Sequence, residues 1–260
     1  MLLTLDVGNT NIVLGVFDGE LLQADWRVRT DRERTTDEHG LLIMHLLESK
    51  GLHKGDLDGF ILSSVVPTMT ETLAKVARNY FDIDPVVIGP ETDFGLKALY
   101  HNPSEIGADR LVNAVAVKQK YGGPAIVVDF GTATTFDALT AEGDYLGGAI
   151  APGIGISSNA LFQAASRLYR VELIAPQHAI GRSTMEAMQS GIIFGFAGQV
   201  DALVKRIRNE LGEDAPAIAT GGLATLISKE CETIRIVDEM LTLNGLKILW
   251  HRNHFNKKFA

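Results

Sequence analysis

The chain carries one strand–turn–strand pattern twice, and this duplication limits the folds open to it more than any other feature. An apolar run at residues 2–5 enters the turn sequence Asp-Val-Gly-Asn-Thr-Asn at residues 6–11, and a run rich in branched residues follows. Residues 125–128 likewise enter Asp-Phe-Gly-Thr-Ala-Thr-Thr at residues 129–135. Glycine in such a turn permits close approach by a ligand. We call residues 6–11 the first turn and residues 129–135 the second turn.

The order of the expected elements repeats as well. Hydrophobic periodicity and turn residues are the signals that we use. In the first half we expect strands at 2–5, 12–17 and 21–28, a helix at 36–50, a strand at 60–65, a helix at 70–80 and a strand at 85–88. In the second half we expect strands at 125–128, 134–139 and 144–150, helices at 153–167 and 184–211, a strand at 217–219, a short helix, a strand at 233–237 and a helix at 241–252. A helix at 102–121 would join the halves.

This repeated order predicts an α/β fold of two duplicated domains, residues 1–101 and 102–260, each with a mixed five-stranded sheet and helices. A chain of 260 residues is long for one core and fits two domains of ordinary size. The alternative is coincidence, because β-meanders and Asp-x-Gly turns are common. The agreement of order and motif together favours duplication.

Charge and cysteine content exclude several classes of protein. The formal net charge of −8 argues against nucleic acid or a membrane surface as a partner, because such binders carry a basic face. The single cysteine, Cys231, can form neither an intramolecular disulfide nor a cysteine-based metal site. The first residues lack the basic segment of a signal peptide. No apolar run approaches the roughly 20 residues of a membrane helix. We therefore expect a soluble cytoplasmic protein.

The two turns together predict a phosphate site. Successive backbone N–H groups in such turns form an anion-binding concavity, and the threonine hydroxyls add donors. Asp6, at a strand end, suits Mg²⁺, which needs only one or two carboxylates when a nucleotide carries it. Each turn alone is equally an ordinary capped hairpin turn. Two of them could face each other across a cleft and clamp a triphosphate. The chain lacks the Gly-Lys-Ser/Thr of a Walker A loop and a Rossmann Gly-x-Gly-x-x-Gly.

A third motif, Gly-Ala-Asp-Arg at residues 107–110, stands where a helix is expected to start. Helix starts favour anions. Asp109 could accept a proton from a hydroxyl nucleophile, and Arg110 could hold a substrate carboxylate through paired hydrogen bonds. The alternative is a surface capping aspartate with a local salt bridge, and spacing alone leaves both open.

Two further glycine-rich stretches close strands of the second half. Gly-Gly-Ala-Ile-Ala-Pro-Gly at residues 147–153 ends a strand, and Thr-Gly-Gly at 220–222 follows another. Small residues there permit close approach by a ligand or by another backbone. In a two-domain ATPase the second stretch would abut the adenosine. Both are equally explained as turns between a strand and a helix.

In their order and spacing, the motifs at residues 6–11, 107–110, 129–135 and 147–153 resemble the type III pantothenate kinase family. This family is part of the superfamily of acetate and sugar kinases, Hsp70 and actin. The resemblance implies two ribonuclease H-like (actin-like ATPase) domains, of which the second carries substrate and dimerisation helices. It also implies phosphorylation of the 4′-hydroxyl of pantothenate by ATP with Mg²⁺, the first committed step toward coenzyme A. A monovalent cation, K⁺ or NH₄⁺, and a homodimer with the substrate site near the subunit interface are further implications.

The same resemblance assigns roles to individual residues. The ATP contacts would be Asp6, Val7, Gly8, Asn9, Thr10, Asn11, Ile12, Val13 and Thr132. Asp109 would be the general base, and Asp129 would hold the monovalent cation. The pantothenate contacts would be Tyr100, Gly107, Ala108, Asp109, Arg110 and Thr184. The alternatives are another small-molecule kinase on the same fold and a non-catalytic nucleotide-binding regulator. Asp109 beside Arg110 disfavours the regulator, because a switch needs no substrate base.

Overall fold

A computed structural model describes residues 1–165, 168–212 and 215–257, which divide into two compact units. The first unit contains Met1–Gly95, Asn102–Ala116 and the chain from Thr242 onward, and the second contains Leu96–His101 and Val117–Leu241. Residues 102–116 and those after 241 therefore group with the first unit. The division at residues 101 and 102 stays a prediction about the two duplicated halves of the chain.

The first unit is built on a five-stranded sheet in the order β3-β2-β1-β4-β5. Strand β1 is antiparallel to β2 and parallel to β4, so the sheet is mixed. The strands of this unit are β1 (Leu2–Val7), β2 (Asn11–Asp18), β3 (Leu21–Arg29), β4 (Gly59–Ser64) and β5 (Val86–Val87). Its helical elements are α1 (Thr36–Glu48), η1 (Lys54–Asp56), α2 (Pro67–Phe81), η2 (Pro103–Glu105), most of α3 (Ala108–Lys120) and nearly all of α7 (Leu241–Lys257).

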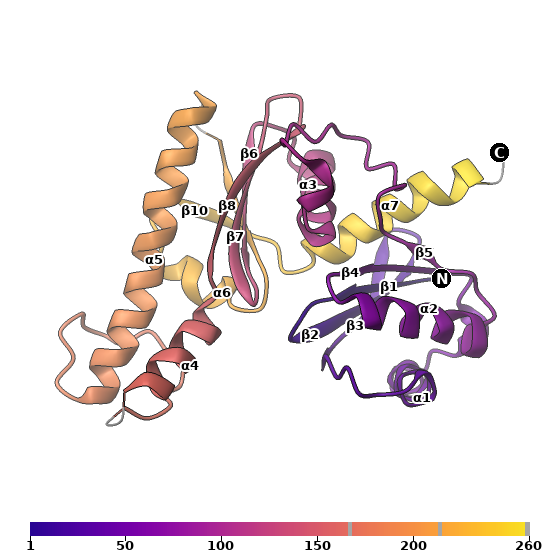
Figure 1. Ribbon diagram of the computed structural model, residues 1–260, viewed down its shortest axis with the longest axis horizontal. Helices are drawn as coiled ribbons and strands as arrows, with labels where there is room; N and C mark the ends of the chain where they lie inside the picture. The colour runs from indigo at the N-terminus through magenta and orange to yellow at the C-terminus, as the bar shows by residue number, and fades with distance from the viewer. Residues whose placement is uncertain (166–167, 213–214, 258–260) are drawn as a thin grey trace. The chain divides into compact units, whose positions relative to one another are not determined.

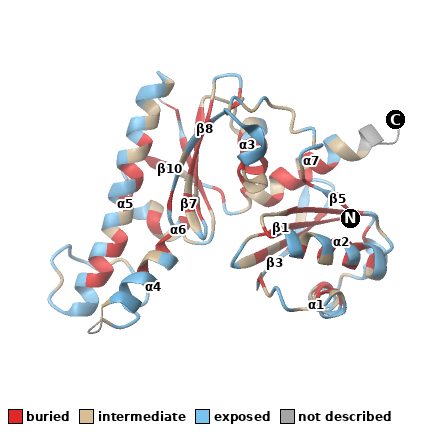
Figure 2. Ribbon diagram, in the orientation of Figure 1, coloured by how far each residue is buried: buried red, intermediate tan, exposed pale blue. Residues whose placement is uncertain are grey.

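The side chains of β1 that face helices α1 and α2 are apolar, and its aspartate lies on the other face of the sheet. Alternate residues of β1, among them Leu3 and Leu5, are fully buried in a core completed by α1 and α2 (Figures 1 and 2). Because side chains alternate along a strand, Asp6 lies on the opposite face. The first sheet therefore holds its aspartate away from the helix pair α1 and α2.

Helix α7 packs against the sheet of the first unit, although it comes from the end of the chain. Two glycines of the sheet make room for it. A Cβ on Gly15 would meet a methyl of Leu243, and a Cβ on Gly59 would meet the Trp250 ring. Lys247 Nζ, in the same helix, donates to Glu20 Oε2 at 2.6 Å.

The second unit repeats the topology of the first. Its sheet has the order β10-β9-β6-β7-β8, with β6 antiparallel to β7 and parallel to β9. The strands are β6 (Ala125–Phe130), β7 (Ala133–Leu139), β8 (Tyr145–Pro152), β9 (Ala217–Thr220) and β10 (Ile234–Val237). The helices that complete it are α4 (Ile154–Ala164), α5 (Thr184–Leu211), α6 (Ala224–Ile227) and η3 (Ser228–Glu230). Two mixed five-stranded sheets of equivalent order confirm the predicted duplicated α/β fold.

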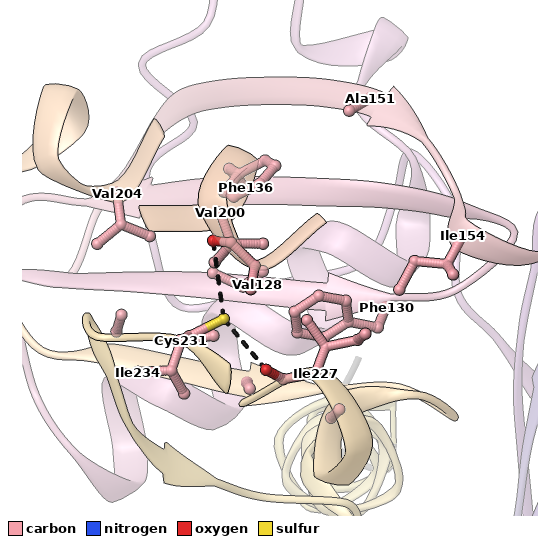
Figure 3. Close-up of a cluster of buried hydrophobic side chains, with 14 of the residues drawn as sticks. Val128, Phe130, Phe136, Ala151, Ile154, Val200, Val204, Ile227, Cys231 and Ile234 are labelled. Carbon is pink, nitrogen blue, oxygen red and sulfur yellow. Dashed lines mark hydrogen bonds between the residues drawn. The ribbon is translucent and has the colours of Figure 1, made fainter. Parts of the chain in front are cut away.

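The core of the second unit lies between its sheet and helices α4, α5 and α6, and Cys231 is part of it (Figure 3). The thiol donates to the carbonyl of Ile227 at 3.3 Å. Burial raises the pKa of Cys231 to about 12, and the nearby carboxylates of Asp201 and Glu230 add to the rise. The thiol is therefore protonated at neutral pH and fills space in the core.

Helix α5 is long and apolar enough to cross a membrane by length and composition alone, contrary to the expectation that no run approaches that length. Its apolar face packs in the core of the second unit, with Ile193, Val200 and Val204 fully buried. Core packing thus accounts for its apolar character.

Several element ends differ from expectation. The helix expected at 102–121 begins only at Ala108, because Pro103–Glu105 forms a separate 3-10 turn. Pro67 begins α2, a position where its missing N–H costs nothing. Helix α4 ends at Ala164, and residues 166 and 167 of the expected helix lie outside the described residues.

Candidate functional site

The first turn connects β1 to β2 and belongs wholly to the first unit. The backbone N–H of Gly8 donates to the Asn11 carbonyl at 2.9 Å and closes the turn. Asn9 and Thr10 at its tip are exposed, and Asp6 is half-buried at the strand end. The turn therefore presents backbone, amide and hydroxyl groups beside one carboxylate, which suits a phosphate with its metal ion.

Not every residue assigned to ATP offers its side chain. Val7 lies in the turn and Ile12 directly follows it, but both side chains are buried in the core of the first unit. Val13 lies opposite Asp6 in the β1–β2 pairing and is half-buried. At Val7 and Ile12, only backbone atoms remain available to a ligand.

The second turn occupies the equivalent place in the second unit. Asp129 is the second-last residue of β6, as Asp6 is of β1. The N–H of Gly131 donates to the Ala133 carbonyl at 3.0 Å, and Thr132 is exposed at the tip. The two turns thus share their position in the fold, and the second is one residue shorter between its strands.

Two further turns of the second unit close around the second turn. Gly221 has a φ of +91°, and a Cβ there would fall on the Asp129 carboxylate. A Cβ on Gly153 would fall on the carbonyls of Gly131 and Thr132. The glycines at 153 and 221 are therefore needed for close approach of backbone to backbone and of backbone to carboxylate.

This arrangement brings backbone close to the Asp129 carboxylate. The carboxylate lies beside Gly221, and it is 3.6 Å from the position of a Cβ on Gly131. Carboxylate and carbonyl oxygens are the donors that hard cations prefer. Within the described residues, no cluster of three or more His, Cys, Asp or Glu side chains could hold a metal ion. Asp129 is the one acidic side chain within residues 129–135.

The third motif lies at the start of α3 in the first unit. Asp109 Oδ1 accepts a hydrogen bond from the N–H of Arg110 at 2.9 Å, within the first turn of the helix. Asp109 is nevertheless half-buried, and Arg110 is buried, with only 7% of its surface exposed. Burial raises the pKa of Asp109, although the Arg110 N–H and guanidinium act to lower it. A carboxyl with a raised pKa next to a cation is typical of functional sites.

Tyr100 lies in the second unit, where a buried network supports it. Its ring packs against the Tyr145 ring at 6.3 Å between centroids, and also against the backbone of Gly147. The Tyr145 hydroxyl donates to Asp137 Oδ1 at 2.8 Å, and both residues are fully buried. Sequence reasoning missed this network. The available signal was Asp137, a charged residue inside an apolar strand.

Thr184 begins α5 and is exposed. Ser183 caps the helix by accepting the N–H of Glu186 at 3.2 Å. The preceding loop is tied to the helix, since Ser190 donates to the Ala179 carbonyl at 2.6 Å. The assigned residues thus divide between the units. Those at 6–13 and 107–110 lie in the first, and Tyr100, Asp129, Thr132 and Thr184 lie in the second.

Comparison with known proteins assigns the family. A family model for type III pantothenate kinase matches residues 2–206. The chain belongs to the type III pantothenate kinase family. A type III pantothenate kinase of Moorella thermoacetica is 53% identical over 253 residues, covering 97% of this chain and 100% of that protein. The one of Geobacter sulfurreducens is 54% identical over 254 residues, covering 97% and 99%.

A solved structure extends the fold comparison. It comes from Campylobacter jejuni, is named for the Baf family of transcriptional activators, and has a TM-score of 0.63 at 20% identity. The alignment covers 98% of this chain and 100% of that one. At this identity the likeness concerns the fold alone.

Proposed function

We infer that the protein transfers the terminal phosphoryl group of ATP to the 4′-hydroxyl of pantothenate, giving 4′-phosphopantothenate in the first step of coenzyme A synthesis. The observation that carries this is the match to relatives of nearly the same length that are about half identical, both named type III pantothenate kinase. The proposal places the reaction in the cytoplasm.

Membership of a kinase family implies ATP and a divalent metal ion. We assign the phosphates to the first turn, where Asn9 and Thr10 present amide and hydroxyl groups at the exposed tip, and the metal ion to Asp6. Held there with ATP, Mg²⁺ would offset the negative charge that develops on the phosphates during transfer.

Asp109 and Arg110 carry the chemistry of the acceptor. Asp109 orients the 4′-hydroxyl and takes its proton as the oxygen attacks, and its raised pKa makes it a better proton acceptor than an ordinary aspartate. Arg110 pairs with the pantothenate carboxylate. Gly107, Ala108, Tyr100 and Thr184 are the remaining substrate contacts of this proposal. Catalysis is then mostly positioning and electrostatics.

Asp129 holds a monovalent cation, K⁺ or NH₄⁺, in this proposal, and Thr132 contacts ATP. The Asp129 carboxylate, which lies beside Gly221 at the end of β6, supports the cation. A chain of net charge −8 without a P-loop lysine needs such positive charge near a triphosphate.

We also propose a homodimer. Among the described residues, more than half of the exposed large apolar side chains lie between residues 150 and 185. They are Ile150, Ile156, Leu161, Phe162, Tyr169, Ile174, Ile180 and Met185. An apolar surface of this kind marks an interface, and a second copy would cover it. Thr184 lies within the same stretch.

A coupled assay of ADP release tests the function. The purified protein is supplied with ATP, Mg²⁺ and K⁺, and with pantothenate or a panel of sugars. We expect turnover on pantothenate, falling when K⁺ is replaced by Na⁺. Turnover on sugars alone would overturn the proposal in favour of another kinase on the same fold. ATP binding without turnover on either would favour a nucleotide-binding regulator.

The same assay tests the proposed base. Asp109→Asn should keep ATP binding and lose turnover by roughly 10²–10⁴-fold, which is the usual contribution of a general base. Unchanged turnover would remove Asp109 from that role.

A further inference from the structure

The segment between β3 and α1, residues 30–35, lies beside the first turn. The N–H of Thr30 donates to the Thr10 carbonyl at 2.9 Å, and its hydroxyl donates to the Gly8 carbonyl at 2.7 Å. Arg32 Nη2 donates to Asn9 Oδ1 at 2.8 Å. We call residues 30–35 the bracing segment, because it contacts three successive residues of the turn.

The bracing segment is itself fixed at both ends. Thr30 is buried, with 8% of its surface exposed. At the other end, Thr35 and Glu38 form a capping box at the start of α1, with the Thr35 N–H donating to Glu38 Oε2 at 2.7 Å. A side chain carried between two fixed points is held near the turn with little further loss of entropy.

Arg32 is the cation that this segment brings to the tip of the turn. It is exposed, and among the described residues its only side-chain partner is the neutral amide of Asn9. Its neighbour Arg34 is different, since it pairs with Asp31 at 3.5 Å. Arg29 lies opposite Asn11 in the β2–β3 pairing.

Beside the proposed phosphate site, the Arg32 guanidinium donates to a neutral amide oxygen and could bind an anionic acceptor more strongly. Phosphate oxygens are stronger acceptors, and the planar guanidinium binds them through two parallel hydrogen bonds. The chain has a net charge of −8 and no P-loop lysine, so positive charge at this turn comes from few side chains.

We propose that Arg32 binds a phosphate group of the ATP that the first turn holds. This inference rests on the proposed function, and it adds a residue to the ATP site that the motif at 6–11 does not contain. The guanidinium donates to Asn9 Oδ1 in the structure. With nucleotide it donates to phosphate.

Nucleotide binding to the purified full-length chain, measured by calorimetry with Mg²⁺, tests this. Arg32→Gln should weaken ATP binding about tenfold or more, as expected for a lost hydrogen bond between charged groups, and leave adenosine binding unchanged. The matched control Arg34→Gln removes the same charge from the same segment and should bind ATP within about twofold of the parent. ATP binding by Arg32→Gln within about twofold of the parent would overturn the proposal.

A second comparison distinguishes direct binding of phosphate by Arg32 from an indirect effect in which Arg32 only holds Asn9 in place. In an Asn9→Ala background, Arg32→Gln should still weaken ATP binding about tenfold. If the double variant binds ATP as well as Asn9→Ala alone, Arg32 acts only through Asn9, and the proposal fails. Melting curves of all variants establish that the fold is intact. Failure of the parent chain to bind ATP at all would instead overturn the proposed function.

Discussion

At the scale of single residues, the Asp109 carboxylate is subject to two opposing effects, a hydrogen bond that favours its ionised form and burial that disfavours it. Helix α3 needs an acceptor at its start, and Asp109 Oδ1 accepts the Arg110 N–H there. The surrounding protein buries the group, and burial raises its pKa despite the neighbouring guanidinium. An ionised carboxylate that the fold desolvates destabilises the folded state, and the proposed reaction uses that same ionised form as the base.

Asp109→Asn should therefore stabilise the fold at neutral pH. Because the folded-state pKa is raised, the protonated form is favoured by folding, and that stability is lost as pH rises through the folded-state pKa. The gain from the neutral amide should thus be largest at pH 7 and vanish below the unfolded pKa of about 3.9. Melting temperatures of parent and variant between pH 3 and 8 measure this.

Asp144→Asn is a control of opposite sign. The Asp144 carboxylate accepts the Lys97 N–H at 3.0 Å, and that hydrogen bond lowers its pKa. Asp144→Asn removes the negative charge and so weakens this hydrogen bond, which should lower the melting temperature at pH 7. Its effect should fade as pH falls through the folded-state pKa, since the parent then loses the same stability. If Asp109→Asn also destabilises at pH 7, the carboxylate supports the fold and burial is not its dominant effect.

At the scale of elements, three turns of the second unit pack together after β6, and glycines at 153 and 221 make this close packing possible. Gly221 combines a positive φ with contact to the Asp129 carboxylate, so any side chain there is both strained and obstructed.

Gly221→Ala should lower stability by roughly 1–3 kcal/mol, the usual range for strained backbone. It should also weaken the proposed activation by K⁺, because a Cβ there would displace the Asp129 carboxylate. Thermal melting and the K⁺ dependence of ADP release measure the two effects. Gly198→Ala, in α5 with open space around it, is the control and should be neutral or stabilising. If K⁺ activates Gly221→Ala as strongly as the parent, Asp129 does not hold the cation.

The elements themselves were well predicted from the sequence, because alternation of apolar residues and glycine turns are local signals. The place of α7 was not, since nothing in residues 241–257 says which sheet they cover. That choice is made by Gly15 and Gly59, more than 180 residues earlier, whose missing side chains admit Leu243 and Trp250.

Only part of the candidate site could be predicted from the sequence. The turns and the start of α3 were visible as motifs. The bracing segment and the Asp137–Tyr145 network were not, because hydrogen bonds such as that of Arg32 to Asn9, 23 residues apart, depend on how strands pair.

At the scale of the whole molecule, the proposed homodimer gives the clearest test. The exposed apolar side chains at residues 150–185 belong to one stretch of the second unit, and Ile180 alone exposes 84% of its surface. Burying apolar area of this kind stabilises an interface by about 25 cal/mol per Å² before the losses of association are subtracted.

Phe162→Asp combined with Leu161→Asp should convert the protein from dimer to monomer, because a charge at a buried interface position is left without a partner. Sedimentation velocity should give twice the 28.2 kDa chain mass for the parent and the single mass for the variant. Leu41→Asp, on exposed α1 of the first unit, is the control and should stay dimeric. If Thr184 contacts pantothenate near the interface, the monomer should also show a raised KM for pantothenate with the KM for ATP little changed. A parent chain that sediments at 28.2 kDa would exclude the dimer and leave the apolar stretch to another partner.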